Sequence, residues 1–295
     1  MPELPEVETI RRQLAPLVEG RRLHSMEILD SRWSRPLAPQ ELADALVGRR
    51  IETLGRRGKY LVWSLEGDVH LAQHLRMTGA VLCEPKPEPA HVRVRIELRP
   101  KRRLVIVDPR RFGTGELLMG SEALDAFFDA RLGLEPLDKR FTAAHLGALT
   151  KGRTAPIKAL LLDQRKIAGV GNIYADEALY RAGIHPRRLA GKLSAEQHRR
   201  LRDAVIEALN AGIDARGATI DDFRHVDGVQ GSFQDQFLVH RREGEPCGEC
   251  GRSIVKMVVA GRGTYVCETC QPRPRVAPRS LRRPQDRPAA RSRRP

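Results

Sequence analysis

The chain of 295 residues lacks long apolar runs and has few aromatic side chains, which make up 4% of it. A membrane-spanning helix needs roughly 18 or more consecutive apolar residues. No stretch approaches that length, so we expect no membrane contact. Carboxylates at Glu3, Glu6 and Glu8 precede any apolar stretch, which argues against a signal peptide. The sequence therefore predicts a soluble cytoplasmic protein, long enough for two domains with a hydrophobic core.

Cysteine is also scarce, and its placement indicates a metal site. Four of the five cysteines form two Cys-x-x-Cys pairs with sixteen residues between them: Cys247, Cys250, Cys267 and Cys270. In a chain without a secretory signal, such pairs favour zinc over disulfides. Thiolates at this spacing can close a tetrahedral site, and metal binding at ~10–16 kcal/mol can keep a small hairpin folded. We therefore predict one structural Zn²⁺.

Acidic residues are outnumbered by basic ones, 37 against 52, which gives a formal net charge of +15. This excess favours a polyanionic partner. Residues 271–295 carry nine Arg against one Asp and few large apolar side chains, which predicts a disordered tail. The tail is either simply solvated or a nonspecific phosphate-binding arm.

Short β-rich segments dominate the first part of the chain. We predict strands at 58–65, 91–98 and 103–108, and two strands joined or bent within 70–82. The apolar spacing over residues 5–18 predicts a helix before them. Several strands punctuated by Pro and Gly indicate an antiparallel sandwich or barrel of roughly 130 residues.

Helical patterns take over near Leu132. We predict helices at 154–163, 172–183 and 194–212, the first with a cap at or near Thr154. Ser194 and Gln197 form a capping box at the start of the third. The four cysteines then predict a zinc hairpin.

The N-terminus allows two interpretations. Removal of the initiator Met would leave Pro2 with a secondary amine, and α-amino groups titrate near about 8, so a neutral fraction exists at pH 7. A neutral amine can attack an electrophilic carbon, as lysines do in Schiff-base catalysis. Alternatively, Glu3, Glu6 and Glu8 only complement a helix dipole, by ~0.3–1 kcal/mol each.

Three further motifs have both a structural and a functional interpretation. The turn IAGVGN (167–172) either approaches a phosphate with helix N-terminal amides or simply joins two helices. DPRRFG (108–113) suits phosphate binding with an apolar wedge in DNA, or it is a surface turn with Phe112 inward. Arg262, between two glycines at the predicted hairpin tip, is either solvated or reaches a ligand.

The motifs follow one another in a characteristic order: PELPEVET, GRRGKYL, HLRMTG, DPRRFG, DQRKIAGVGNIYADEAL, AGIHP and GEPCGEC…GRGTYVCETC. In this order they resemble bacterial formamidopyrimidine-DNA glycosylase over residues 2–270. The resemblance implies a base excision repair enzyme that flips and excises oxidised purines, such as 8-oxoguanine, from double-stranded DNA and nicks the strand by β,δ-elimination. It implies no small-molecule cofactor, and one cleft per chain makes a monomer sufficient.

The resemblance also implies an α+β multidomain fold. An N-terminal antiparallel β-sandwich with flanking helices is expected at 2–132, and a helix–two-turns–helix domain at 133–240. A four-cysteine zinc finger is expected at 241–270, followed by the tail at 271–295. DNA would lie in the cleft between the two larger domains.

By the same resemblance, each candidate catalytic residue has an expected role. Pro2 is the nucleophile that attacks the anomeric carbon, and Glu3 is the acid that protonates the sugar ring oxygen. Lys59 is assigned to β-elimination and Arg262 to δ-elimination. Glu6 is a supporting carboxylate, although its dipole role is the simpler account.

The resemblance assigns six more residues to DNA binding. Chemistry on a stacked base requires that the nucleotide be flipped out of the duplex, which leaves a gap. Three side chains are expected to fill this gap: Met77, Arg110 and Phe112. For Met77, core packing is the alternative. Three others are expected to position the DNA backbone: Arg111, Arg153 and Asn172.

The sequence departs from the family pattern at several places. His91 lacks the preceding His of a His-x-His-Val motif, so that DNA contact is not carried over. The loop GATIDDF (217–223) has Asp221 where a basic residue is usual. The resemblance therefore does not determine which damaged base is excised. His240-Arg241 replaces an expected Tyr-Gly pair, and the tail is longer than usual.

Two alternatives remain at this point. An endonuclease VIII-like enzyme would act on oxidised pyrimidines, but such chains more often begin Pro-Glu-Gly-Pro and lack the DPRRFG loop. Leu4 and residues 110–113 therefore favour the purine branch. A non-catalytic zinc-finger DNA-binding protein would need neither Pro2 nor Glu3.

Overall fold

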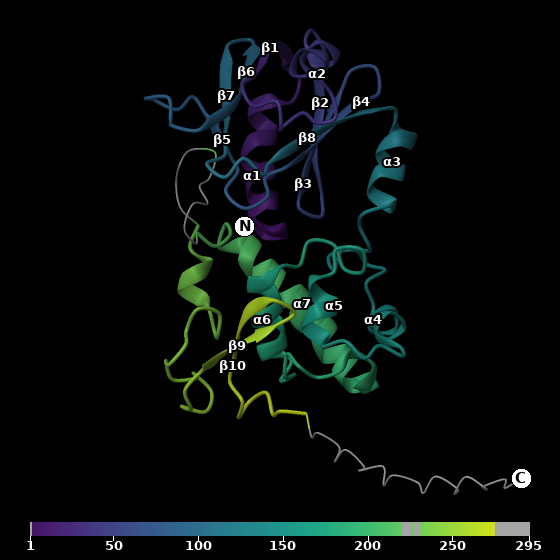
Figure 1. Cartoon of the computed structure of the whole chain (residues 1–295), viewed down its shortest axis with the longest axis vertical. Helices are drawn as coiled ribbons and strands as arrows, with labels where there is room; N and C mark the ends of the chain where they lie inside the picture. Colours follow the sequence, from purple (N-terminus) through teal and green to yellow (C-terminus); the bar gives the residue numbers. More distant parts are fainter. Residues whose placement is uncertain (1, 220–225, 227–230, 275–295) are drawn as a thin grey trace, which may run out of the picture.

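Two antiparallel four-stranded sheets form the first half of the chain, with the strand orders β1-β6-β7-β5 and β2-β3-β4-β8 (Figure 1). The strands are β1 (Arg22–Ile28), β2 (Ile51–Arg57), β3 (Tyr60–Leu65), β4 (Val69–His74), β5 (Ala80–Cys83), β6 (Val92–Arg99), β7 (Arg102–Val107) and β8 (Thr114–Met119). The predicted sandwich is confirmed, and segment 70–82 contains two strands, β4 and β5. Sequence analysis missed β1, β2 and β8. In β1 and β2 a pairing irregularity breaks the alternation of apolar residues.

The computed structural model describes residues 2–219, 226 and 231–274. Most of the predicted tail, residues 275–295, lies outside this described part. Among the helices within it, none has the length and apolarity needed to cross a bilayer.

The core of the sandwich comes from alternating apolar residues of both sheets. In β6, Val92, Val94, Ile96 and Leu98 are buried while the intervening side chains are more exposed. Helix α2 (Pro39–Leu46) packs against β1, and α3 (Ser121–Asp129) packs against β8. The period-two pattern that predicted these strands is therefore the pattern that fills the core.

The N-terminal helix α1 (Leu4–Val18) belongs to both halves of the molecule. Val7, Ile10 and Leu14 are buried in the core of the sandwich. Leu4, fully buried, packs instead into the core of the helical half. Pro16 lies inside the last turn, and the helix continues to Val18. The start of this helix is therefore fixed where the two halves meet.

The second half of the chain is helical and ends in the hairpin. Its helices are α4 (Ala143–Thr150), α5 (Ile157–Leu162), α6 (Asn172–Arg181) and α7 (Ala195–Asp214), with short 3₁₀ turns at Ala190–Lys192 and Phe233–Gln236. The capping box of α7 is confirmed, since Ser194 and Gln197 exchange hydrogen bonds of 3.0 and 3.2 Å. The cap predicted at or near Thr154 is Pro156, which makes no side-chain cap hydrogen bond, and α5 begins at Ile157. Strands β9 (Val255–Val259) and β10 (Arg262–Val266) form the predicted hairpin.

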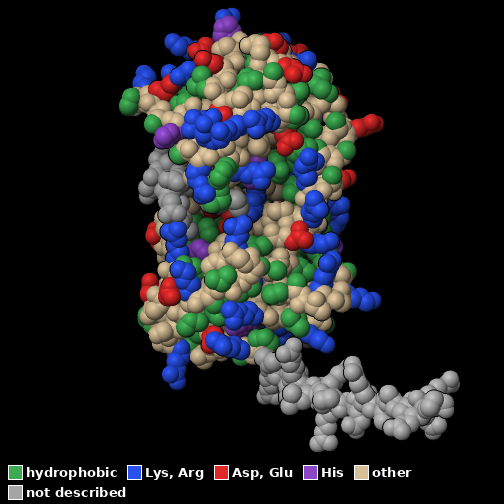
Figure 2. Space-filling view, viewed as in Figure 1, with side chains coloured by type: hydrophobic (Ala, Val, Ile, Leu, Met, Phe, Trp, Pro, Cys, Tyr) green, Lys and Arg blue, Asp and Glu red, His purple; other side chains and the backbone are tan. Residues whose placement is uncertain are grey.

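Lysine and arginine side chains gather around the hollow between the two halves (Figure 2). Four of them line one pocket there: Lys59, Arg76, Arg241 and Arg262. The hollow is therefore the surface best suited to a polyanion.

We expect Leu4→Ala to lower the free energy of unfolding by about 2–5 kcal/mol, because it removes a buried side chain from the junction of the two cores. Urea unfolding followed by circular dichroism measures the loss. Leu29→Ala is the control, since Leu29 is 45% exposed and should change stability by less than about 0.5 kcal/mol. Equal effects of the two substitutions would contradict this role of Leu4.

Candidate active site

A pocket of about 460 Å³ opens where the start of α1, the strands β2–β4, the N-terminus of α6 and the zinc hairpin meet. Five of the predicted site residues line it: Glu3, Lys59, Met77, Asn172 and Arg262. They come from positions up to 259 residues apart in sequence, and no local pattern could have placed them together. The other predicted site residues do not line this pocket.

Glu3 lies where the N-terminus of the chain meets the first turn of α6. Its side chain is 2% exposed, and its Oε1 accepts a hydrogen bond of 3.1 Å from the backbone N–H of Ile173 in the first turn of α6. The positive end of a helix favours a carboxylate at this position. A Cβ at Gly171 would overlap the Glu3 carboxylate, so the close approach requires glycine. Among the described residues, the buried Glu3 Oε2 has no hydrogen-bond partner.

Pro2 is buried immediately before Glu3. The backbone N–H of Leu4, two residues on, donates to the carbonyl of Gly169 at 3.1 Å. Gly169 has a φ of +92°, and a Cβ there would overlap the Leu4 side chain. The glycine-rich turn predicted from IAGVGN therefore seats the N-terminus of the chain beside the pocket.

Glu6 joins three segments beneath the pocket. Its Oε2 accepts from the N–H of Glu3 at 2.8 Å, and its Oε1 accepts from the Tyr174 hydroxyl at 2.7 Å and the Ala218 N–H at 2.8 Å. Burial raises the pKa of Glu6, and the charge of Glu3 raises it further, while these hydrogen bonds oppose the rise. Glu6 thus connects the N-terminus to α6 and to the first residues of loop 217–223. The rest of that loop, including Asp221, lies outside the described residues.

Lys59 follows the tight turn between β2 and β3, where Gly58 has a φ of +56°. Its side chain is 4% exposed. Burial lowers the pKa of Lys59, the charges of Glu3 and Glu6 oppose the change, and Arg262 adds to it. Glu135 fixes the turn by accepting from the Gly58 N–H at 2.6 Å. The amine therefore stands near the carboxylates in a state that loses its proton more readily than an exposed lysine.

Arg262 begins β10 and is exposed at the pocket. Its neighbour Gly263 accepts from Asn172 Nδ2 at 3.0 Å. Behind it, the fully buried Lys158 donates to Asp176 Oδ1 at 2.6 Å and to Thr264 Oγ1 at 2.8 Å. These hydrogen bonds hold the zinc hairpin against α6, and they thereby fix the position of Arg262 relative to Glu3.

The DPRRFG loop is organised by Asp108, which is 1% exposed. Its Oδ2 accepts from the N–H groups of Phe112 and Gly113 at 2.8 and 2.7 Å, and its Oδ1 accepts from the Thr78 hydroxyl. Phe112 points outward with 50% exposure, and the Arg110 guanidinium lies 4.9 Å from the centre of its ring. The interpretation with Phe112 tucked inward is wrong.

The two predicted backbone-binding arginines outside the pocket differ in their surroundings. Arg111 donates to both oxygens of the buried Asp30, at 2.6 and 2.9 Å. The hydrogen bonds from Arg111 lower the pKa of Asp30 to about 2. Arg153 is exposed and donates from Nε to the carbonyl of Leu149 at 3.3 Å. Within the described chain, the guanidinium of Arg153 therefore makes a weaker hydrogen-bonding contact than that of Arg111, which is paired with a carboxylate.

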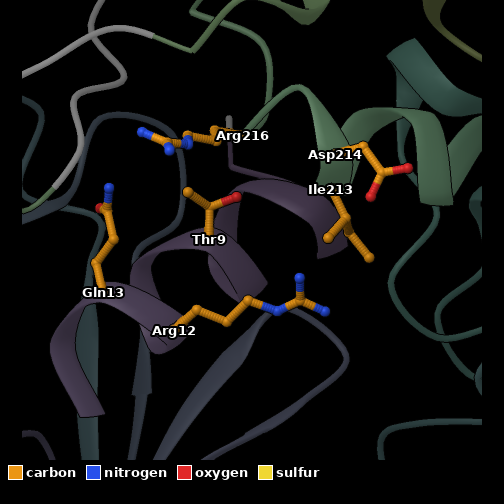
Figure 3. Close-up of a pocket in the computed structure, with 6 residues that line it drawn as sticks. All are labelled: Thr9, Arg12, Gln13, Ile213, Asp214 and Arg216. Carbon is orange, nitrogen blue, oxygen red and sulfur yellow. The ribbon is translucent and has the colours of Figure 1, made fainter. Parts of the chain in front are cut away.

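A second pocket, of about 390 Å³, lies between α1 and the end of α7 (Figure 3). Its wall is formed by Thr9, Arg12, Gln13, Ile213, Asp214 and Arg216. None of these is a predicted site residue. Arg12 is already paired with Glu8 at 2.8 Å, and the mixed charges define no single ligand.

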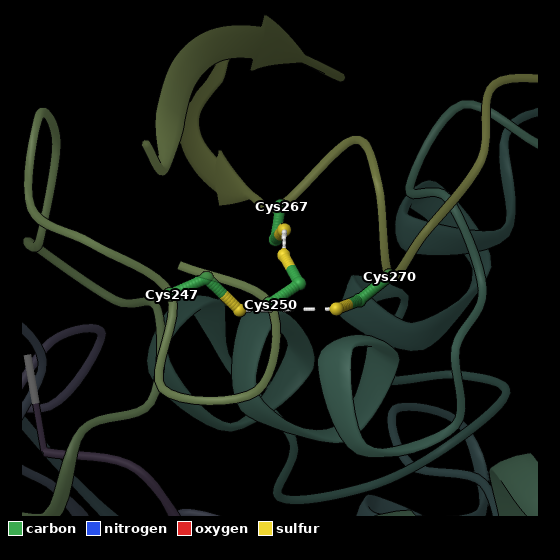
Figure 4. Close-up of side chains that lie close together, drawn as sticks. All are labelled: Cys247, Cys250, Cys267 and Cys270. Carbon is green, nitrogen blue, oxygen red and sulfur yellow. Dashed lines mark hydrogen bonds between the residues drawn. The ribbon is translucent and has the colours of Figure 1, made fainter. Parts of the chain in front are cut away.

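The four cysteines converge on one point below the hairpin (Figure 4). All four sulfurs lie within 4.8 Å of one another, with Cys250 and Cys267 at 3.4 Å and Cys247 and Cys270 at 3.8 Å. A tetrahedron built on Zn–S bonds of about 2.3 Å has edges of about 3.8 Å. The residues therefore fit one structural zinc ion, as predicted.

Several residues of the site were missed by sequence analysis because their roles depend on tertiary contacts. Asp108, Glu135, Asp176 and Glu177 are buried carboxylates that bind backbone or side-chain donors from distant segments. His74 lines the pocket, and burial, together with the charges of Arg76 and Lys59, lowers its pKa to about 3. The one available signal for these buried carboxylates was the adjacent acidic pair Asp176 and Glu177 in NIYADEAL, since both residues lie in a helix otherwise rich in apolar residues.

We expect Cys250→Ser to lose the zinc and to unfold the hairpin while the β-sandwich stays folded, because the metal replaces a hydrophobic core there. Metal analysis and limited proteolysis measure the two effects. Cys83→Ser is the matched control, since Cys83 lies in β5 outside the cluster, and it should keep one zinc per chain. Unchanged zinc content in Cys250→Ser would refute the site.

Comparison with known proteins places the chain in one family. Its residues 1–115 match the model of the formamidopyrimidine-DNA glycosylase N-terminal domain, 132–224 the H2TH domain of the same enzyme, and 244–273 a zinc finger found in FPG and IleRS. Formamidopyrimidine-DNA glycosylase of Chloroflexus aurantiacus is 46% identical over 92% of this chain and 98% of its own. The crystal structure of MutM (Fpg) from Thermus thermophilus has a TM-score of 0.82 at 44% identity, covering 92% of this chain and 98% of that one. Lactococcus lactis Fpg bound to abasic-site DNA has a TM-score of 0.85 at 34% identity, covering 92% of this chain and 100% of that one. The chain belongs to the formamidopyrimidine-DNA glycosylase family.

Proposed function

We propose that this protein excises oxidised purines from double-stranded DNA through a Schiff base on Pro2 and then nicks the strand by β,δ-elimination. As a member of its family, it is a base excision repair glycosylase with lyase activity. The observation that carries the proposal is the convergence of Glu3, Lys59 and Arg262 in one pocket beside the N-terminus.

The glycosylase step uses the N-terminus. With Met1 removed, the Pro2 amine attacks the anomeric carbon, the bond to the base breaks, and the proton that the amine loses neutralises the departing base. Glu3 Oε2, the oxygen without a partner among the described residues, protonates the sugar ring oxygen. The ring opens, and the nitrogen lone pair completes an iminium. Glu6 supports the geometry by its hydrogen bond to the N–H of Glu3.

The lyase steps follow from the iminium, which acidifies the adjacent sugar carbon. Burial lowers the pKa of Lys59, which suits it to take the proton whose loss expels the 3′ phosphate. Arg262 supports the second elimination, in which the 5′ phosphate leaves. Asn172 bonds to Gly263, so it steadies the strand carrying Arg262 besides its proposed contact with DNA.

Flipping the damaged nucleotide leaves a gap in the duplex. We propose that Phe112, which is half-exposed, fills it together with Arg110 and Met77. Arg111 and Arg153 position the DNA backbone. Arg111 does so while it remains paired with Asp30.

The choice of lesion rests on the family. Solved complexes of Lactococcus lactis Fpg contain abasic-site DNA, Fapy-dG DNA and an oxidised pyrimidine, and a MutM complex contains carbocyclic 8-oxo-G. We propose oxidised purines as the substrates here. We further propose that one chain acts alone on DNA in the cytoplasm. We also propose domain boundaries between residues 132 and 133 and between residues 240 and 241.

We expect borohydride to trap a covalent adduct between the processed protein and an 8-oxoguanine duplex, because reduction fixes the iminium. Pro2→Gly should give little or no adduct, since a primary amine replaces the secondary one and the terminus loses its rigid ring. Denaturing gels measure the trapped fraction. No adduct on either an 8-oxoguanine or an abasic-site duplex would refute the enzymatic proposal and favour a non-catalytic DNA-binding protein.

A panel of oxidised purines and pyrimidines, opposite each base, tests the lesion class separately. Faster excision of oxidised purines is expected. Preferential excision of oxidised pyrimidines would move the protein to the endonuclease VIII-like alternative while leaving the lyase chemistry intact.

We expect Arg153→Gln to weaken binding of all DNA sequences alike and to reduce the salt dependence of log K by about one unit, as for the loss of one phosphate contact. Binding titrations at several salt concentrations measure the slope. Arg95→Gln is the matched control, since Arg95 is paired with Glu27 and Glu88 on the surface of β6. Equal slopes for both variants would contradict a contact between Arg153 and the DNA backbone.

A further inference from the structure

Asp30 is paired with Arg111 of the DPRRFG loop, and the function proposed above gives this carboxylate no role of its own. Asp30 is buried and follows β1 in the chain. Its two oxygens accept from Nε and Nη2 of Arg111, at 2.6 and 2.9 Å. A carboxylate here offsets the positive charge that would attract a phosphate. Affinity for DNA therefore does not explain the pair.

Arg111 has a backbone conformation that needs support. Its φ is +60°, in the left-handed region that an arginine rarely adopts. Its backbone N–H donates to the carbonyl of Asp108 at 3.3 Å, which is long for such a bond. The two shorter hydrogen bonds to Asp30 hold the side chain of the same residue. Because Arg111 stands between Arg110 and Phe112, a change in its φ would redirect both neighbours.

Asp30 is itself anchored to the strand that follows the DPRRFG loop. The carbonyl of Asp30 accepts from the Trp33 N–H at 2.9 Å, and the carbonyl of Trp33 accepts from the Gly115 N–H in β8 at 2.8 Å. The Trp33 ring lies so close to Gly115 that a Cβ there would come within 2.2 Å of it. The turn at residues 30–33 is therefore packed on β8, and the pair with Arg111 extends this support to the loop.

The supported residues are the ones that the proposed function inserts into DNA. Phe112 is half-exposed, and the Arg110 guanidinium lies 4.9 Å from the centre of its ring. Exposure of an aromatic ring to water is unfavourable, so a loop free to change its backbone would turn the ring towards apolar surface. A wedge inserts efficiently when its direction is fixed before the DNA arrives.

We propose that Asp30 is a positioning residue for the DNA wedge, which keeps Phe112 directed outward by holding Arg111. This inference rests on the proposed function. Loss of the carboxylate then has two effects of opposite sign. DNA binds at least as tightly, because the charge of Arg111 is no longer offset, whereas the wedge enters the duplex less often. A residue that only stabilised the fold would lower both binding and insertion.

The test compares zinc-loaded wild type with Asp30→Asn on a duplex that carries an uncleavable tetrahydrofuran abasic analogue. A 2-aminopurine stands beside the base opposite the analogue, and its fluorescence rises when a wedge unstacks it. With protein at saturation, the rise should be at least about twofold smaller in Asp30→Asn, because the strained backbone of Arg111 can then relax. The dissociation constant should be equal to or below that of wild type. The salt dependence of log K should steepen by up to about one unit.

Asp138→Asn is the matched control, since Asp138 binds Nε and Nη2 of Arg140 through both oxygens in the segment before α4. It should keep the wild-type fluorescence, affinity and salt dependence. Phe112→Ala should remove most of the fluorescence rise, which shows that the signal reports the wedge. A full rise in Phe112→Ala, or no binding by wild type, would count against the proposed function rather than against the role of Asp30.

A wild-type fluorescence rise in Asp30→Asn would overturn the proposal. So would weaker binding of DNA by this variant, or an equal fluorescence loss in Asp138→Asn. If circular dichroism shows that Asp30→Asn does not fold, Arg111→Gln breaks the same pair from the side of the loop. It should show the same loss of fluorescence at saturation, and an unchanged rise would overturn the proposal.

Discussion

The contact between the Glu3 carboxylate and the first turn of α6 is the interaction on which the site depends. It places the carboxylate of Glu3 against an amide 170 residues further along the sequence. Ile173 provides the amide and Gly171 leaves the space. The positive end of α6 and the surrounding burial together set where that carboxylate can lie.

The same helix also fixes the far side of the pocket. Asp176 bonds to Lys158 and His240, and Glu177 accepts from the backbone N–H groups of residues 238–240. The hairpin has a small core of its own, so it relies on zinc and on these buried polar contacts. Breaking one partner of such a buried pair leaves an uncompensated charge, which costs several kcal/mol. The position of Arg262 is therefore determined by α6 as much as by the metal.

Sequence patterns were sufficient where the physical cause is local. The alternation in β6, the capping box at Ser194 and the spacing of the four cysteines each arise within a few tens of residues, and the structure confirms all three. Patterns failed where a pairing irregularity broke the alternation, as in β1 and β2. They also left open the orientation of Phe112, because Asp108 turns that loop outward through contacts that cross between strands.

The sequence by itself determined the residue types of the chemistry: a proline beside a glutamate at the N-terminus, two evenly spaced pairs of thiols, and arginines in a glycine-bearing loop and hairpin. It also determined the family, since these motifs occur in one order. Only the tertiary structure decided which of these groups share a pocket and which arginine is already paired with a carboxylate. The reason is physical: burial, helix dipoles and hydrogen bonds between distant segments act across space, so their effects on the position and charge of a side chain are absent from its local sequence.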